Sequence, residues 1–131
     1  IVCIGRRLGP IEETAQEIKD LGGQALAISC NTADRDMVNE VVKKTVETFG
    51  TVDVMINNAQ SIPQSAPVEE TTYDSMYLAW STGTIGALNF MQACFPYMRA
   101  KDVLLILLRL PGCLVLPVNW LMPATKKRFA V

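Results

Sequence analysis

The chain has 131 residues, of which 50% are hydrophobic and 19% are charged, and its formal net charge is −1. This size and composition predict one domain with a hydrophobic core and exclude global disorder. The near-neutral charge gives no reason to expect a nucleic-acid partner. Because the chain has no histidine and its four cysteines show no CxxC spacing, we expect no metal site and no imidazole chemistry.

Hydrophobic periodicity predicts alternating strands and helices. Short apolar runs are typical of buried parallel strands, and apolar residues at helical spacing predict amphipathic helices. Pro10 has the residue type favoured at the start of a helix, and Gly50 the type favoured after its end. The predicted elements, in chain order, are a strand at 1–4, a helix at 10–21, a strand at 25–29, a helix at 34–49, a strand at 52–56, a long helical stretch at about 69–101 and a strand at 103–108.

Strand–helix units about 25 residues long predict right-handed crossovers and a parallel sheet. The predicted fold class is therefore α/β, a doubly wound parallel sheet of the Rossmann type, truncated at both ends. Ligands bind such sheets at the carboxyl ends of the strands. The candidate cofactor-binding residues at these ends are Gly5, Arg6, Arg7, Asn31, Thr32, Asn57, Asn58, Ala59 and Gln60.

The apolar stretch from Val103 to Val118 is too short for a transmembrane helix, which needs about 20 apolar residues, and it contains Arg109 and two prolines. We expect a buried strand followed by a loop there, and no membrane partner. Cys3 and Cys30 lie in apolar runs, as does Cys113, which favours small buried side chains over disulfides. A reducing cytoplasm fits that interpretation.

Arg6 and Arg7 follow the first predicted strand. In a dinucleotide-binding fold an acidic residue at this place binds the 2′-hydroxyl of NAD, whereas a guanidinium group suits the 2′-phosphate of NADP. Two arginines and no acid favour NADP over NAD as the cofactor. The alternative is that both arginines are solvated side chains without a ligand.

The segment V-D-V-M-I-N-N-A-Q, which ends at Gln60, resembles the L-V-N-N-A-G segment of short-chain dehydrogenases/reductases, with Gln60 in place of the usual glycine. I-V-C-I-G-R-R and A-I-S-C-N-T resemble the second and third strands of that family. Asn31 and Thr32 stand where the family has an aspartate, which contacts the adenine, and a valine. The resemblance covers residues 1–101 well, while 102–131 diverge within what we expect to be a single partial dinucleotide-binding domain.

The resemblance implies hydride transfer between a nicotinamide cofactor and the carbonyl or hydroxyl carbon of a small-molecule substrate. It also implies a homo-oligomer formed through the long helices. The family binds the cofactor pyrophosphate with a glycine-rich turn, which by family order should precede Ile1. Gly5-Arg6-Arg7-Leu8-Gly9 lacks the spacing of that turn and follows the wrong strand.

The family's catalytic set combines a Tyr-x-x-x-Lys pair with a serine and an asparagine. M-P-A-T-K, ending at Lys126, resembles the pair, with Met122 at the tyrosine place and Lys126 as the remaining candidate catalytic residue. A thioether cannot donate a proton. The serine place falls near Arg109 or Leu110 and the asparagine place on Trp80. We therefore expect no appreciable turnover from the chain as written, and Lys126 could equally belong to a solvated basic tail.

Two functional hypotheses follow. The first is an NADP-dependent short-chain oxidoreductase by descent, with residues 102–121 either truly divergent or read in an altered frame. The second is a non-catalytic oligomerisation or protein-interaction module that uses the long helices. The apolar side chains that could form such an interaction surface are Met76, Tyr77, Trp80, Phe90, Met91, Phe95 and Met98. The alternative is that these side chains pack in the core or in an ordinary homodimer.

Overall fold

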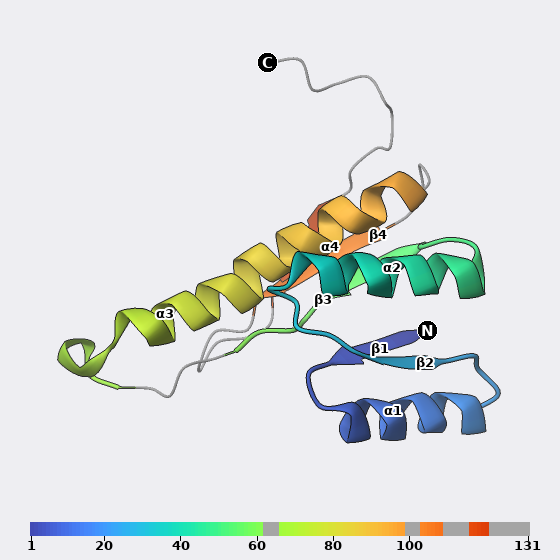
Figure 1. Ribbon diagram of the computed structural model, residues 1–131, viewed down its shortest axis with the longest axis horizontal. Coiled ribbons are helices and arrows are strands. Elements are labelled where there is room, and N and C mark those ends of the chain that lie inside the picture. The colour runs from blue at the N-terminus through green and yellow to red at the C-terminus, as the bar shows by residue number, and fades with distance from the viewer. Residues whose placement is uncertain (62–65, 99–102, 109–115, 121–131) are drawn as a thin grey trace, which may run out of the picture.

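The computed structural model describes residues 1–61, 66–98, 103–108 and 116–120 (Figure 1). Its strands are β1 (Val2–Gly5), β2 (Leu26–Ser29), β3 (Val54–Asn57), β4 (Val103–Leu108) and β5 (Leu116–Trp120). Its α-helices are α1 (Leu8–Asp20), α2 (Arg35–Phe49), α3 (Tyr73–Trp80) and α4 (Gly86–Cys94). A π-helical turn at Ser81–Ile85 joins α3 to α4, and single 3-10 turns lie at Val68–Glu70 and Phe95–Tyr97.

The strands are mainly parallel, and helices cover them from two sides. β1 pairs in parallel with β2, and β3 pairs in parallel with β4. Figure 1 shows α1 along one side of β1 and β2, with α2 and α4 on the other side. This arrangement confirms the predicted α/β class with a parallel sheet and helices on both faces.

Strand β5 was not predicted. It runs antiparallel to β4, in a register that places Leu104 opposite Trp120, and it forms the edge of the three-stranded sheet β3-β4-β5. The stretch after the strand at 103–108 was predicted to be a loop, and Pro117 within it cannot donate a ladder hydrogen bond. An edge strand tolerates this loss, since one side of its backbone has no partner strand.

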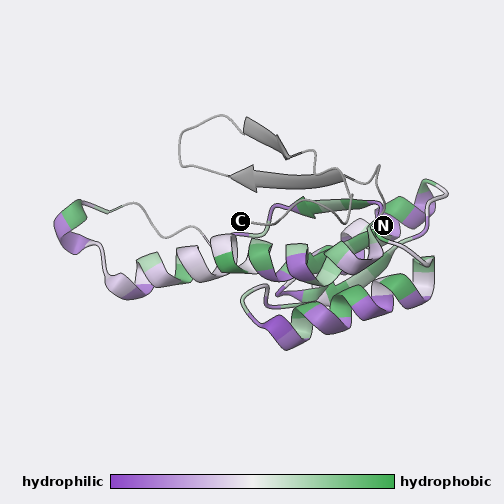
Figure 2. Ribbon diagram, turned by 90° about the horizontal axis from the view of Figure 1, so that it is seen from above, coloured by the Kyte–Doolittle hydropathy of each residue, from purple (hydrophilic) through white to green (hydrophobic). Residues whose placement is uncertain are grey.

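The hydrophobic core lies on the α2 and α4 side of the strands. Figure 2 shows hydrophobic and hydrophilic residues alternating around these helices, as amphipathic helices require. The buried cluster combines the residue that follows β2 with residues from α2, from α4 and from the segment before β3. Its members are Cys30, Val38, Val41, Val42, Val52, Phe90 and Cys94.

Local signals explain the bounds of α2. Asp34 is its N-cap, and the Asp34 carboxylate accepts hydrogen bonds from the backbone N–H groups of Asp36 and Met37 at 3.0 and 3.1 Å. Gly50 ends the helix in the left-handed conformation, with φ at 81°. The first helix, α1, begins at Leu8, earlier than the start predicted at Pro10. Pro10 is tolerated because the first turn of a helix has N–H groups without partners in any case.

The long helix predicted at about 69–101 is interrupted. Thr72 caps α3 by accepting a hydrogen bond from the Ser75 N–H, so the regular helix begins later than predicted. In the π-helical turn the Gly86 N–H bonds to the carbonyls of Ser81 and Gly83. Periodicity missed this turn because a single widened turn shifts the apolar stripe without ending it.

Candidate functional site

The carboxyl end of β1 forms an open pocket with the first turn of α1. The described residues that line it include two cations and no acid: Gly5, Arg6, Arg7, Pro10 and Ile11. A Cβ on Gly5 would lie 3.0 Å from Ile11 Cγ2, so glycine allows the chain to turn closely from strand to helix. Arg7 is the N-cap residue of α1 and Arg6 precedes it, so both arginines lie next to a helix N-terminus, where the helix dipole also favours an anion.

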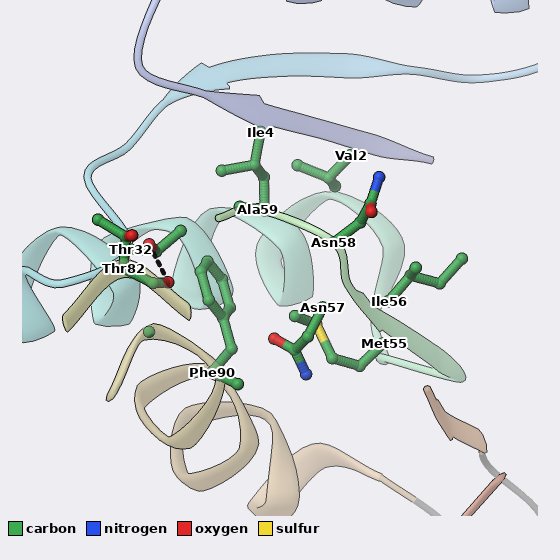
Figure 3. A pocket seen from close by; sticks show the side chains of 12 residues that line it. Val2, Ile4, Thr32, Met55, Ile56, Asn57, Asn58, Ala59, Thr82 and Phe90 are labelled. Carbon is green, nitrogen blue, oxygen red and sulfur yellow. Dashed lines mark hydrogen bonds between the residues drawn. The ribbon is translucent and has the colours of Figure 1, made fainter. Parts of the chain in front are cut away.

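A second cavity, of about 220 Å³, separates β1 from β3 (Figure 3). Val2 and Ile4 line it from β1, and Met55 and Ile56 from β3. Among the described strands, β1 pairs with β2 and β3 pairs with β4, so the two edges that face this cavity have no strand between them. In Figure 3 the direction of β1, from Val2 to Ile4, is the same as the direction of the chain from Ile56 on β3 to Ala59, so the two strands are parallel.

The polar end of this cavity carries two of the predicted cofactor-binding amides, Asn57 and Asn58. Figure 3 shows Asn58 pointing toward β1 and Asn57 pointing to the opposite side of the strand, as consecutive residues in an extended chain do. Asn57 Nδ2 is buried and has no hydrogen-bond partner among the described residues. A buried amide without a partner is costly, which marks Asn57 as a group suited to a polar ligand.

The loop after β2 contains Asn31 and Thr32. The Asn31 side-chain oxygen accepts a hydrogen bond from the Ala33 N–H at 3.2 Å and so stabilises the turn before α2. Thr32 Oγ1 donates to the Thr82 carbonyl at 3.1 Å, and the Thr32 carbonyl accepts from Asn89 Nδ2, also at 3.1 Å. Thr32 thus lies at the edge of the cavity but is held by the helical segment.

The loop after β3 contacts the π-helical turn. A Cβ on Gly83 would lie 3.3 Å from Gln60 Cγ, so the Gln60 side chain lies against the bare backbone of Gly83. The Ser61 N–H donates to Thr82 Oγ1 at 2.9 Å. Ala59 lines the cavity between these contacts and the strand.

The structure brings Thr32, from the loop after β2, together with Asn57, Asn58 and Ala59 around one cavity, which Asn31 and Gln60 do not line. Gly5, Arg6 and Arg7 line a separate pocket at the end of β1. Lys126, Met122, Arg109 and Leu110 lie outside the described residues. Trp80, which took the asparagine place in the sequence, ends α3 and is 54% exposed.

Sequence reasoning missed Thr82 and Asn89, the two buried polar residues of the described core, which are 6% and 7% exposed. Neither belongs to a motif, and both lie in a stretch that was predicted as one regular helix. Their only signal in the sequence is that each is a polar residue beside apolar positions. The interaction that explains each residue is long-range and therefore invisible to periodicity.

The described cysteines are buried or half-buried free thiols, as expected for Cys3 and Cys30. Burial raises the pKa of the Cys94 thiol to about 11, and burial together with the Asp34 charge raises the pKa of Cys30. Within the described ranges no cluster of three or more metal-binding side chains is found. No helix in the described part of the chain is long and apolar enough to cross a membrane.

The sequence matches the family model for short chain dehydrogenases over residues 1–106. Hydroxysteroid dehydrogenase-like protein 2 of Rattus norvegicus is 35% identical over 100 residues, which are 76% of this chain and 19% of that protein. The chain therefore spans about a fifth of the length of this relative.

Two solved structures show the same arrangement of elements. A short-chain dehydrogenase of Mycobacterium thermoresistibile has a TM-score of 0.70 and 32% identity, and the match covers 77% of this chain and 38% of that one. A short-chain dehydrogenase of Burkholderia cenocepacia J2315, solved in complex with NADP, has a TM-score of 0.73 at 20% identity, and the match covers 79% of this chain and 42% of that one. This second likeness shows the fold alone. The family match, the sequence relatives and the parallel α/β arrangement together show that the chain belongs to the short-chain dehydrogenase/reductase family.

Proposed function

We propose that this chain is part of an NADP(H)-dependent oxidoreductase that interconverts a carbonyl and a hydroxyl group on a small-molecule substrate. The observation that carries the proposal is the pocket at the end of β1, where Arg6 and Arg7 lie beside the first turn of α1. A planar guanidinium group binds a phosphate through two parallel hydrogen bonds, and the helix N-terminus adds partial positive charge. The negatively charged 2′-phosphate of NADP would interact favourably with this positive charge, whereas the 2′-hydroxyl of NAD is neutral and would gain little from it.

The remaining predicted residues fit the other parts of a dinucleotide. Asn57 Nδ2 is a buried donor without a partner among the described residues, which suits a ribose or amide oxygen at the end of β3. Asn31 uses its side-chain oxygen in a local turn, so its amide nitrogen is the group available to an adenine. The bound cofactor would supply the hydride, while these residues would bind and orient it.

We also infer that the complete site includes one more parallel strand, placed between β1 and β3. Both facing edges run in the same direction, and one strand there would join the two sheets. Val54 and Ile56 are 55% and 53% exposed on β3, although strands of parallel sheets are buried on both faces. Because the connections between neighbouring parallel strands are almost always right-handed, a strand preceding β1 would bring its own helix to the α1 side, over these two side chains.

We further propose that the chain as written has no appreciable turnover, because Met122 stands at the tyrosine place of the family's catalytic pair. A thioether has no proton to give to a developing alkoxide, and no shift of its surroundings changes that. Incubating the chain with NADPH and a panel of ketones and aldehydes, while following the absorbance of reduced nicotinamide, tests this point. Clear protein-dependent oxidation of NADPH would contradict it.

The cofactor preference is tested by replacing both arginines. We expect Arg6→Ser/Arg7→Ser to weaken NADPH binding at least about tenfold, as expected from loss of charge-assisted hydrogen bonds, and to leave NADH binding unchanged. Isothermal titration of both cofactors measures the two affinities. Arg35→Ser, at the exposed start of α2, is the matched loss of a positive charge and should leave the ratio unchanged. Equal weakening of both cofactors would contradict a 2′-phosphate site.

One observation favours the second function, an interaction module. Large apolar side chains on α3 are exposed, among them Tyr73 at 96% and Tyr77 at 67%. Of the side chains named for this surface from the sequence, Phe90 is buried in the core and Met98 packs against it, while Met76, Tyr77, Trp80 and Phe95 are exposed. We propose that α3 forms a homo-oligomer contact, since such a patch is costly to leave in water.

Sedimentation of the chain and of a Tyr77→Glu/Trp80→Glu variant tests this contact. A shift of the variant to the monomer supports it, and an unchanged association state contradicts it. NADPH titration on the unaltered chain then distinguishes the two functions. Retained NADPH affinity favours the oxidoreductase part, and a tight oligomer without any cofactor binding favours the module.

A further inference from the structure

Both strand-end loops that would hold a dinucleotide are hydrogen-bonded to one residue of the π-helical turn, Thr82. Thr82 Oγ1 accepts the Ser61 N–H of the loop after β3. The Thr82 carbonyl accepts the Thr32 hydroxyl of the loop after β2 at 3.1 Å. Figure 3 shows this second contact at the edge of the cavity.

The π-helical turn makes the Thr82 carbonyl available. In a regular α-helix the Gly86 N–H would bond to the carbonyl four residues earlier, which is that of Thr82. Here the Gly86 N–H bonds to the carbonyls of Ser81 and Gly83 instead. The Thr82 carbonyl therefore lacks the helical bond from Gly86 and accepts the Thr32 hydroxyl.

The Thr82 side chain stabilises the same turn. Its hydroxyl donates to the Leu78 carbonyl at 2.7 Å while accepting from the Ser61 N–H, so both functions of the hydroxyl are used. Thr82 is only 6% exposed, and a buried polar group that loses its partners is costly. Asn89, in the following helix α4, donates a further hydrogen bond from its Nδ2 to the Thr32 carbonyl.

We propose that Thr82 is a positioning residue that holds the loops after β2 and β3 in one fixed geometry at the cofactor end of the sheet. This role rests on the proposed function only in the statement that a dinucleotide spans the two loops. The coupling between the loops belongs to the chain itself. A widened helical turn would thus serve as the support for a site built on two separate strands.

Hydrogen exchange of the Ser61 amide tests the coupling in the chain as it exists. We expect Thr82→Val, which removes the hydroxyl and keeps the shape, to speed exchange of this amide about tenfold, as for the loss of one buried hydrogen bond. Thr82→Ser keeps the hydroxyl and should restore slow exchange. Thr32→Val should also speed Ser61 exchange, although Thr32 does not touch Ser61, because it releases the Thr82 carbonyl.

Thr45→Val is the matched control. Thr45 Oγ1 donates to the Val41 carbonyl at 2.7 Å, the same local bond as that from Thr82 to Leu78, but it lies on α2 away from both loops. It should leave Ser61 exchange unchanged. Unchanged Ser61 exchange in Thr82→Val, or equal acceleration in Thr45→Val, would overturn the proposal.

NADPH titration of the same variants tests the positioning role. If the dinucleotide spans both loops, Thr82→Val should weaken NADPH binding while Thr82→Ser and Thr45→Val retain it. Suppose that the Ser61 amide exchanges slowly in the wild-type chain and faster in Thr82→Val, but that the wild-type chain binds neither NADPH nor NADH. This outcome would refute the proposed function and leave the coupling between the loops supported. Normal NADPH affinity in a Thr82→Val chain with fast Ser61 exchange would refute the positioning role.

Discussion

Replacing Gly86 by alanine should destabilise the protein, although alanine is the better helix former. A Cβ at this position would lie 2.7 Å from Thr32 Oγ1 and 2.8 Å from Thr32 Cβ. Thr32 cannot easily move away, because its hydroxyl donates to Thr82 and its carbonyl accepts from Asn89. The substitution therefore forces either a shift of α4 or the loss of at least one of these two hydrogen bonds.

The expected change in the free energy of unfolding combines two unfavourable contributions and one favourable one. Adding a methyl group to a packed site costs about 1–3 kcal/mol. Losing a buried hydrogen bond adds about 1 kcal/mol, whereas replacing glycine by alanine in a helix returns about 1 kcal/mol. We therefore expect Gly86→Ala to lower the free energy of unfolding by about 1–3 kcal/mol, measured by urea denaturation followed by circular dichroism.

Two other glycines provide matched controls. A Cβ on Gly9, in α1, meets nothing within 4 Å, so Gly9→Ala should raise the free energy of unfolding by about 0.4–1 kcal/mol. The three atoms nearest to a Cβ on Gly83 all belong to the side chain of Gln60, at 3.3–3.4 Å, and that flexible chain can move. Gly83→Ala should therefore be close to neutral.

The clash itself is tested by removing its partner. In a Thr32→Gly background the two closest contacts disappear, and the next one is the Thr32 backbone carbon, at 3.4 Å from the added Cβ. The cost of Gly86→Ala should then fall by at least half. A Gly86→Ala protein as stable as Gly9→Ala, or an unchanged cost in the Thr32→Gly background, would refute this reasoning.

Three further predictions concern local features. Burial raises the pKa of Cys94 from 9.0 to about 11, so between these two pH values the folded state keeps a proton that the unfolded chain loses. The free energy of unfolding should therefore fall by up to about 1.4 kcal/mol per pH unit as the pH rises through this window. Cys94→Ala should show a smaller fall in a pH series of urea midpoints. Asp34→Ala should cost about 1 kcal/mol through loss of the α2 cap, whereas Asp34→Asn should cost little; equal melting temperatures for both would contradict the cap. Gly50→Ala should cost about 1–2 kcal/mol because φ is 81°, with Gly50→Asn less harmful in the same thermal melts.

The elements that depend on local signals could be predicted from the sequence. The bounds of α2 follow from Asp34 and Gly50, whose cap geometries act within a few residues. The strands β1 to β4 follow from short apolar runs, because a parallel strand buried on both faces needs side chains of one kind. The order of these elements, together with the Asn57-Asn58 pair, was sufficient to indicate the family.

Long-range contacts decided the rest. The break between α3 and α4 depends on Thr82, whose carbonyl accepts from a residue fifty positions earlier in the chain and whose hydroxyl accepts from Ser61. The exposure of Tyr77 and the burial of Phe90, both apolar residues of one predicted helix, differ because only α4 packs against α2. Sequence alone determined which segments form strands and helices, since caps and periodicity are local. Only the tertiary structure decided how the loops after β2 and β3 are held, since that depends on hydrogen bonds between distant residues.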